Sequence, residues 1–299
     1  MRNRFQLSPL AAIAATALAG AALAGCSSES NDASGSDIIA TTNVWADVAS
    51  AVTGSDVDAI ITGDAVDPHH FEPSAKDLAR IKGANTVVAN GGAYDAALYT
   101  AAEQDRIIYA IPLLDEHDHE HAHDHDHMPD SLDELEHAWF APEKVLQVAE
   151  DIADRTGGDA SDVKQRIGEI QSKLNAVPHV HIGMTETIAA GLVWGTELHD
   201  ITPEEYVKAS LNHQEPSASA VAAFLEQIER GELDMLFVNP QSTNSATQRL
   251  ADAAKAHNVP VVEIRETPPA GQNFLDYFEE IVGQITDIAA HAEPTDHHH

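Results

Sequence analysis

The chain has 299 residues and a formal net charge of −33, from 16 basic and 49 acidic side chains. So acidic a protein repels nucleic acid phosphates and anionic lipid surfaces, and we expect no nucleic acid partner. Hydrophobic residues make up 43% and aromatic residues 5%, a balance typical of α/β proteins long enough to form one or two cores, which excludes a wholly disordered chain.

The N-terminus has the pattern of an exported bacterial protein. Two arginines precede an apolar run over 10–24, which is too short for an ordinary transmembrane helix and typical of a signal peptide. The run ends just before Cys26, the one cysteine, and small residues before a cysteine resemble a lipobox. We therefore expect a signal peptide over 1–25, a lipidated Cys26, a flexible tether over 26–36, and anchoring to the outer face of the cell membrane.

Short apolar runs alternate with amphipathic stretches after the tether, which favours βαβ units and parallel sheets. Ser74 and Asp77 have the spacing of a capping box variant and predict a helix over 74–82. An N-terminal α/β lobe is expected over 37–141. Its predicted strands are 38–42, 57–62, 86–90 and 107–111.

The second half of the chain repeats this alternation. Residues 142–177 are helical in pattern except at Gly157 and Gly158, which predicts a connecting segment of two helices, the second beginning near Ser161. A C-terminal lobe is expected over 178–291, followed by a tail over 292–299. Its predicted strands are 180–184, 235–239 and 259–264, and its predicted helices are 218–230, 246–257 and 274–289.

These elements predict an α/β fold of two lobes, each a small parallel sheet with flanking helices. A rigid connecting helical segment joins the lobes, because a helix of about 16 residues spans roughly 24 Å. Ligands of open α/β sheets bind beyond the carboxyl ends of the strands. We therefore expect the functional site in the cleft between the lobes.

Two motifs place histidines at this cleft. Asp-Pro-His-His-Phe-Glu-Pro over 67–73 follows a predicted strand, and His-Ala-Trp-Phe-Ala-Pro over 137–142 precedes the connecting segment. Either histidine alone could be a solvated loop residue. Together the motifs resemble those of the zinc/manganese solute-binding lipoproteins of ABC importers, and the resemblance extends over 38–289.

The resemblance implies four metal ligands, two from each lobe: His69, His137, Glu186 and Glu266. Imidazole and carboxylate groups are suitable donors for zinc, and carboxylates shift the preference toward manganese. Two carboxylates also cancel the charge of a divalent cation. We therefore expect a buried, nearly neutral site when the metal is bound.

Two alternatives at this site stay open in the sequence. Arg265 could form an ion pair with the neighbouring Glu266 and keep it from the metal. His179 or His181, on one face of the strand before Glu186, could complete the site instead. His199 has no supporting neighbours in the sequence, and we interpret it as an ordinary surface residue.

A histidine-rich loop is predicted over 115–127, where the sequence reads DEHDHEHAHDHDH. Such a segment cannot pack into a core, so we expect a solvated low-complexity loop. Its imidazoles also suit weak capture of zinc for delivery to the cleft. The auxiliary capture residues are His117, His119, His121, His123, His125 and His127.

The predicted function is that of an extracytoplasmic receptor, not an enzyme, that delivers a divalent metal to the permease and ATPase of an ABC importer. The chain lacks a phosphate-binding glycine loop and a nucleophile elbow, and a fourth protein ligand closes the position that metal catalysis needs. Zinc is favoured and manganese is the alternative. An extracellular zinc buffer or adhesin is the competing function. We expect a monomer.

Overall fold

The structure of the chain is a computed structural model that describes residues 37–63, 71–114 and 128–292. Several predictions fall outside these ranges: the signal peptide, Cys26 and its tether, His69, the histidine-rich loop over 115–127 and the C-terminal tail from residue 293 onward. Within the described ranges, no helix combines the length and the apolar character that crossing a bilayer requires.

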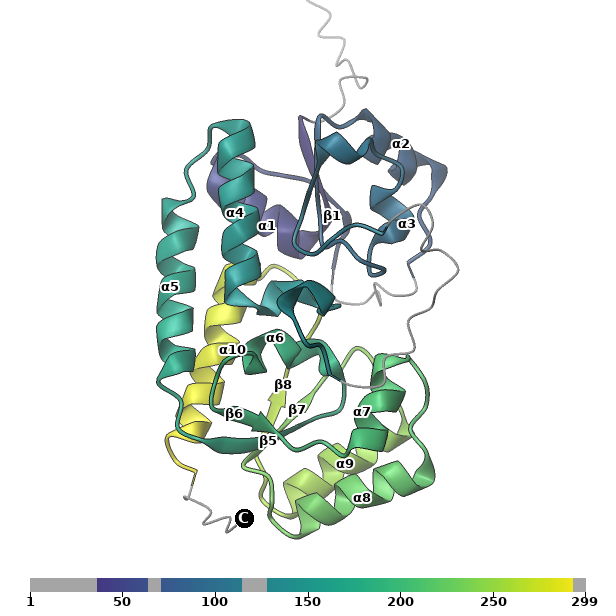
Figure 1. The fold of residues 1–299 in the computed structure, drawn as a ribbon, viewed down its shortest axis with the longest axis vertical. Coiled ribbons are helices and arrows are strands. Elements are labelled where there is room, and N and C mark those ends of the chain that lie inside the picture. Colours follow the sequence, from purple (N-terminus) through teal and green to yellow (C-terminus); the bar gives the residue numbers. More distant parts are fainter. Residues whose placement is uncertain (1–36, 64–70, 115–127, 293–299) are drawn as a thin grey trace, which may run out of the picture. The chain divides into compact units, whose positions relative to one another are not determined.

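The first sheet has four parallel strands in the order β2-β1-β3-β4 (Figure 1). Every residue of β3 is buried, as a parallel sheet covered on both faces requires. The register pairs Ala40 of β1 with Ala59 of β2, and Val88 of β3 with Ile108 of β4. The strands are β1 (Ile38–Thr42), β2 (Ala59–Ile61), β3 (Thr86–Ala89) and β4 (Ile107–Tyr109), and their helices are α1 (Asn43–Thr53), α2 (Ala75–Gly83) and α3 (Ala96–Tyr99).

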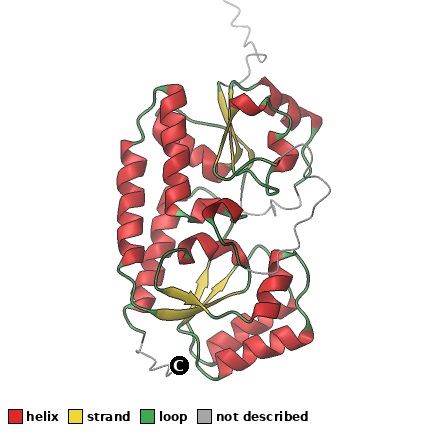
Figure 2. Ribbon diagram, viewed as in Figure 1, coloured by secondary structure: helices red, strands yellow, loops and turns green. Residues whose placement is uncertain are grey.

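The second sheet repeats this topology, with parallel strands in the order β6-β5-β7-β8 (labelled in Figure 1), and Figure 2 shows both sheets with helices beside them. The strands β5 and β7 lie inside the sheet and are mostly apolar, whereas β6 is a short edge strand with polar residues. The strands are β5 (Val180–Met184), β6 (Leu198–Asp200), β7 (Met235–Val238) and β8 (Val261–Glu263), and their helices are α6 (Ala190–Val193), α7 (Glu204–Leu211), α8 (Ala218–Glu229) and α9 (Ser245–Ala256).

Three long helices complete the fold: α4 (Pro142–Thr156), α5 (Ser161–Asn175) and α10 (Phe274–Ala289). Gly157 ends α4 in the left-handed conformation, at φ 73°, and the chain turns back into α5. Figure 1 shows α4 and α5 side by side as an antiparallel pair, and α5 also packs against α1 and α10. The expected connecting segment is therefore a helical hairpin. Its second helix, α5, contacts both α1, which follows the first strand of the first sheet, and α10, which follows the last strand of the second sheet.

One hydrophobic core extends across residues of both sheets and the long helices. Phe140, in the short turn η5 (Ala138–Phe140), lies at its centre with no exposed surface. Its ring centroid is 5.7 Å from that of Phe278 and 6.3 Å from that of Phe274, both in α10. Burial of one such side chain contributes about 2 kcal/mol, so this packing fixes the turn that follows His137.

The predicted fold class is confirmed: the described residues form two four-stranded parallel sheets with flanking helices. The capping box of α2 is also present, with Ser74 accepting from the Asp77 backbone and Asp77 accepting from the Ser74 backbone. The edge strand β6 has no counterpart among the predicted strands, because Leu198-His199-Asp200 is too short and too polar to form an apolar run.

Candidate metal centre

Three of the predicted ligands lie in loops that follow strands or precede a short turn. Glu186 lies between β5 and the turn η6 (Thr187–Ala189), and Glu266 follows β8. His137 immediately precedes the turn η5, whose Trp139 and Phe140 side chains are buried. The carboxyl ends of parallel strands meet at one edge of a sheet, which is why Glu186 and Glu266 come together.

The potential ligand atoms of His137, Glu186 and Glu266 all lie within 4.8 Å of one another. His137 is 3% exposed and Glu266 is 2% exposed, while Glu186 is half-buried. One imidazole and two carboxylates are suitable donors for a transition metal ion, and the two negative charges balance a divalent cation. In the part of the chain that the structure describes, this is the one group of three such residues with ligand atoms that close together.

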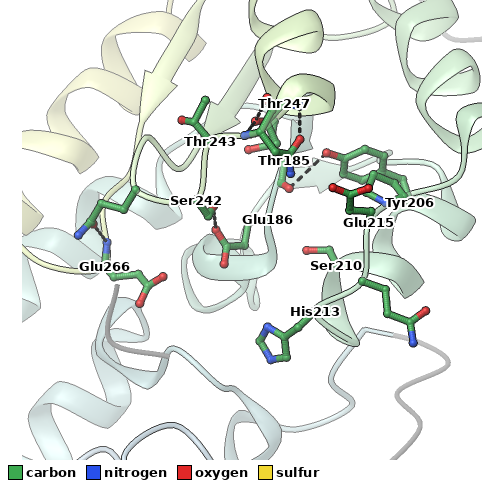
Figure 3. A pocket seen from close by; sticks show the side chains of 14 residues that line it. Thr185, Glu186, Tyr206, Ser210, His213, Glu215, Ser242, Thr243, Thr247 and Glu266 are labelled. Carbon is green, nitrogen blue, oxygen red and sulfur yellow. Dashed lines mark hydrogen bonds between the residues drawn. The ribbon is translucent and has the colours of Figure 1, made fainter. Parts of the chain in front are cut away.

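Polar side chains from two loops hold the two carboxylates. The Asn239 amide donates to Glu186 at 2.7 Å and to Glu266 at 3.3 Å, and the Ser242 hydroxyl donates to Glu186 (Figure 3). The Tyr94 hydroxyl, from the loop after β3, donates to Glu266 at 3.0 Å. Two carboxylates at such a separation repel each other by about 3 kcal/mol at an effective dielectric constant of about 20, and these donors offset part of that repulsion.

Tyr94 keeps its proton in this environment. Burial, together with the adjacent charge of Glu266, raises the pKa of Tyr94 well above its usual value. The phenol therefore acts as a hydrogen-bond donor to the Glu266 carboxylate and not as a competing anion. Because Tyr94 follows the first sheet and Glu266 follows the second, this hydrogen bond joins the two halves of the fold at the site.

A buried carboxylate organises the loop that leads to Tyr94. Asp95 accepts hydrogen bonds from the Thr41 hydroxyl at 2.6 Å, the Asn90 backbone at 2.7 Å and the Gly91 backbone at 3.0 Å. Burial raises the pKa of Asp95 to about 6, although these hydrogen bonds act in the opposite direction. The Asn90 side chain in turn donates to the Glu136 carbonyl at 2.8 Å, which ties this loop to the residue before His137.

The His137 ring lies in an aromatic environment. Its centroid is 5.6 Å from that of Tyr94 and 5.2 Å from that of Trp139, both in edge-on geometry. Gly191 of α6 packs directly against the turn after His137, since a Cβ atom there would lie 2.8 Å from the Phe140 carbonyl carbon. Close packing on both sides therefore restricts where this imidazole can lie.

A cavity of about 380 Å³ opens beside the two carboxylates (Figure 3). Glu186, Ser242 and Glu266 line one part of it, and His213 lines another. His213 lies just beyond α7, and its ring is 3.2 Å from Glu136, the residue before His137. The two candidate carboxylate ligands are therefore reached from this cavity.

Two of the alternatives that the sequence left open concern residues that the structure describes. The Arg265 guanidinium lies 3.7 Å from Glu263, and Glu266 receives its hydrogen bonds from Tyr94 and Asn239 instead. His179 and His181 lie at the amino end of β5, whereas Glu186 follows its carboxyl end. Five residues of strand span about 16 Å, so neither histidine reaches the other two candidate ligands.

Tyr94, Asn239 and Ser242 were not among the predicted site residues. Asn239 comes immediately after β7, and Tyr94 follows β3 by five residues. Their position beyond the carboxyl ends of strands is the one signal in the sequence that could have identified them. The fourth predicted ligand, His69, lies outside the described residues, two positions before Phe71, which packs against the core of the first sheet.

Comparisons with solved structures agree with this architecture. A crystal structure of ZnuA aligns with a TM-score of 0.60 at 16% identity, over 85% of this chain and 98% of that chain. The laminin-binding protein Lmb of Streptococcus agalactiae, described as bifunctional with adhesin and metal transporting activity, aligns with a TM-score of 0.59 at 14% identity, over 84% and 98%. Zn(II)-bound AdcA from Streptococcus pneumoniae aligns with a TM-score of 0.57 at 17% identity, over 87% of this chain and 59% of that chain.

At these identities the structural likeness establishes the fold. The search of curated proteins found no significant match. The family model for the zinc-uptake complex component A, periplasmic (ZnuA), matches residues 38–288, which is most of the chain. The predicted resemblance is thereby confirmed, and the chain belongs to the ZnuA family of periplasmic zinc-uptake components.

Proposed function

We propose that this chain is an extracytoplasmic receptor that captures zinc at His137, Glu186 and Glu266 and delivers it to the permease of an ABC importer. The observation that carries the proposal is the convergence of one buried imidazole and two carboxylates within 4.8 Å of one another. Family membership supports the role in uptake. Receptor function requires capture and release of the ion and no chemical change in it.

We propose His69 as the fourth ligand. The candidate group in the described residues has a single imidazole, and a tetrahedral zinc site takes four ligands. A second imidazole would complete the coordination and favour zinc over manganese, because nitrogen donors suit zinc and the general order of affinities also places zinc above manganese. Zinc is therefore the proposed cargo. Manganese is the alternative, and competition between the two metals distinguishes them.

The binding cycle follows from the charges of the site. Without metal, two neighbouring carboxylates repel, and the hydroxyl and amide protons of Tyr94 and Asn239 hold them in place. A divalent cation replaces this repulsion with attraction and neutralises both charges. Because proton and metal compete for the same imidazole and carboxylate atoms, metal affinity should fall as the pH decreases.

The direct test is calorimetric titration of zinc into the full chain and into His137→Ala and His69→Ala. We expect one tightly bound ion in the unmodified protein and loss of tight binding in both variants. His257→Ala is the matched control, because His257 is an exposed histidine that follows α9 and precedes β8, whereas Glu266 follows β8. Unchanged affinity in both ligand variants would contradict the proposal, and competition with manganese decides between the two metals.

The membrane attachment and the histidine-rich loop are separate proposals. Cys26 is the proposed lipid attachment site, and Cys26→Ala should move the protein from the membrane fraction to the soluble extracytoplasmic fraction. Deleting 116–127 distinguishes a receptor from a zinc buffer or adhesin: a receptor keeps its one tight ion, whereas a buffer loses most of its bound metal. We also propose that the chain acts as a monomer, which sedimentation with and without zinc tests.

A further inference from the structure

Three histidines meet on the second sheet at the end opposite the candidate metal centre. His179 precedes β5, His181 lies two residues further along it, and His199 lies in the edge strand β6. Alternate residues of a strand point to one face, so the side chains of His179 and His181 share a face. The β5–β6 register pairs His181 directly with His199, which brings the third ring to the same face.

The spacing of these rings matches that of a zinc site. The ring centroids of His179 and His181 are 5.3 Å apart, and each lies 5.5 Å from that of His199. With Zn–N bonds of about 2.0 Å, a bound imidazole has its centroid about 3.2 Å from the metal, so tetrahedral geometry separates two centroids by about 5.2 Å. All three observed separations are within a few tenths of an ångström of this value.

A metal-bound histidine usually directs its other ring nitrogen to a carboxylate or a backbone carbonyl, and two of the three rings already have such a partner. His179 Nδ1 lies 3.3 Å from the Glu197 carboxylate, and His181 Nδ1 lies 3.3 Å from the Glu232 backbone carbonyl. A carbonyl oxygen only accepts, so this contact is a hydrogen bond in the tautomer that carries the proton on Nδ1, and in that tautomer Nε2 is the metal-binding atom. A carboxylate or carbonyl that orients the other ring nitrogen in this way strengthens metal binding.

The surroundings of the three rings favour a cation. Glu197 lies beside His179, and the Asp234 carboxylate accepts a hydrogen bond from the His181 backbone at 2.7 Å. His179 and His199 are exposed, so an ion can approach from solvent and keep a water molecule as its fourth ligand. Among the described residues, the candidate metal centre is the one group whose ligand atoms already lie within 4.8 Å of one another. The rings of the three histidines must therefore rotate to bring their nitrogen atoms onto one ion. Exposed rings rotate about χ2 at low cost.

We propose that His179, His181 and His199 form a second zinc-binding site, separate from the metal centre at the carboxyl ends of the strands. This site has three imidazole ligands and one position open to solvent, so it binds zinc in fast exchange and more weakly than a closed four-ligand site. Because His199 belongs to the edge strand β6 and His181 belongs to β5, the bound ion also links β6 to its neighbour.

The test compares the number of zinc ions bound by the full chain and by His199→Gln, measured by equilibrium dialysis with elemental analysis over a series of micromolar zinc concentrations. We expect His199→Gln to bind one ion fewer than the unmodified chain. The matched control is His257→Gln, which removes an exposed histidine that belongs to neither proposed site and should change nothing. The other histidines of the chain contribute equally to all three proteins, so the difference reports on this cluster alone.

A second measurement identifies the ligands directly. Zinc should shift the ring nitrogen resonances of His179, His181 and His199 together in the unmodified chain, and the shifts at His179 and His181 should be lost in His199→Gln. Equal zinc binding by the variant and the unmodified chain, or rings that do not respond to zinc, would overturn the proposal. The tight ion at the carboxyl ends should survive in His199→Gln, so its presence or absence tests the proposed receptor function separately.

Discussion

Replacing Glu266 with glutamine distinguishes a metal ligand from a structural carboxylate, because the two roles predict opposite effects on the metal-free protein. Glu266 is 2% exposed and its carboxylate lies within 4.8 Å of the ligand atom of Glu186. At that separation two like charges repel by about 3 kcal/mol at an effective dielectric constant of about 20. Glutamine has nearly the same volume and removes the repulsion together with the cost of burying a charge.

Lost hydrogen bonding reduces this gain. Tyr94 and Asn239 each donate to one oxygen of Glu266, and glutamine offers a single acceptor oxygen. Losing one hydrogen bond to a charged group costs about 2 kcal/mol, so the metal-free variant should be more stable than the parent by about 1 kcal/mol. For a domain of this size that corresponds to an increase of about 2–4 °C in Tm.

In excess zinc, the parent should be more stable than Glu266→Gln. A ligand at 1,000 times its Kd stabilises the folded state by about 4 kcal/mol, and Glu266→Gln should lose most of that stabilisation. Differential scanning calorimetry in chelator and in excess zinc measures both states, with Glu263→Gln as the control on an exposed carboxylate of β8. If Glu266→Gln is less stable than the parent in chelator, and if zinc raises its stability as much as it raises that of the parent, Glu266 is a structural carboxylate and not a metal ligand.

Three further substitutions test the supporting structure. Tyr94→Phe removes the hydroxyl that donates to Glu266 at 3.0 Å, and zinc affinity measured by chelator competition should fall about 10-fold to 100-fold. Burial raises the pKa of Asp95 from 3.8 to about 6, so between these pH values the folded state binds a proton that the unfolded state has lost. As the pH rises from about 4 to 6, the free energy of unfolding of the metal-free protein should therefore fall by about 3 kcal/mol. Urea unfolding should show this slope in the parent relative to Asp95→Asn, and parallel profiles would contradict it. Gly191→Ala places a Cβ atom 2.8 Å from the Phe140 carbonyl carbon, so Tm should fall and zinc affinity should fall with it, whereas an unchanged Tm would show that the turn can shift.

The sequence predicted the inner strands because they are continuous apolar runs, and it predicted the long helices because their apolar residues recur at helical spacing. The strands β1, β3, β5 and β7 are buried on both faces, and α10 has an apolar stripe along its length. The supporting residues of the site could not be predicted in the same way. Tyr94 and Glu266 are 172 residues apart, and only the folded chain brings the hydroxyl to the carboxylate.

The histidine cluster shows the same limit at one strand. His199 has no metal-binding neighbours in the sequence, and its strand β6 is too short and polar to be recognised from an apolar pattern. Once β6 pairs with β5, the register brings His199 opposite His181. The grouping of the three rings is therefore a consequence of edge-strand pairing, which local sequence patterns predict poorly.

The packing around α10 indicates where motion during metal binding can occur. The Asp47 carboxylate of α1 accepts a hydrogen bond from the first residue of α10, Phe274, at 2.7 Å. Arg166 of α5 pairs with Asp276 at 2.5 Å and with Glu279 at 2.6 Å, both in α10. With a continuous core beneath these contacts, rotation of one sheet against the other would break several interactions at once.

The candidate ligands instead lie on the loops after β5 and β8 and before η5, outside the helices that make these contacts. Uptake and release of the ion should therefore depend on local shifts of these loops, with the Tyr94–Glu266 hydrogen bond limiting their range. Hydrogen exchange with and without zinc tests this directly. Protection should change at the residues around Glu186 and Glu266, and similar changes throughout α5 and α10 would instead indicate motion of whole lobes.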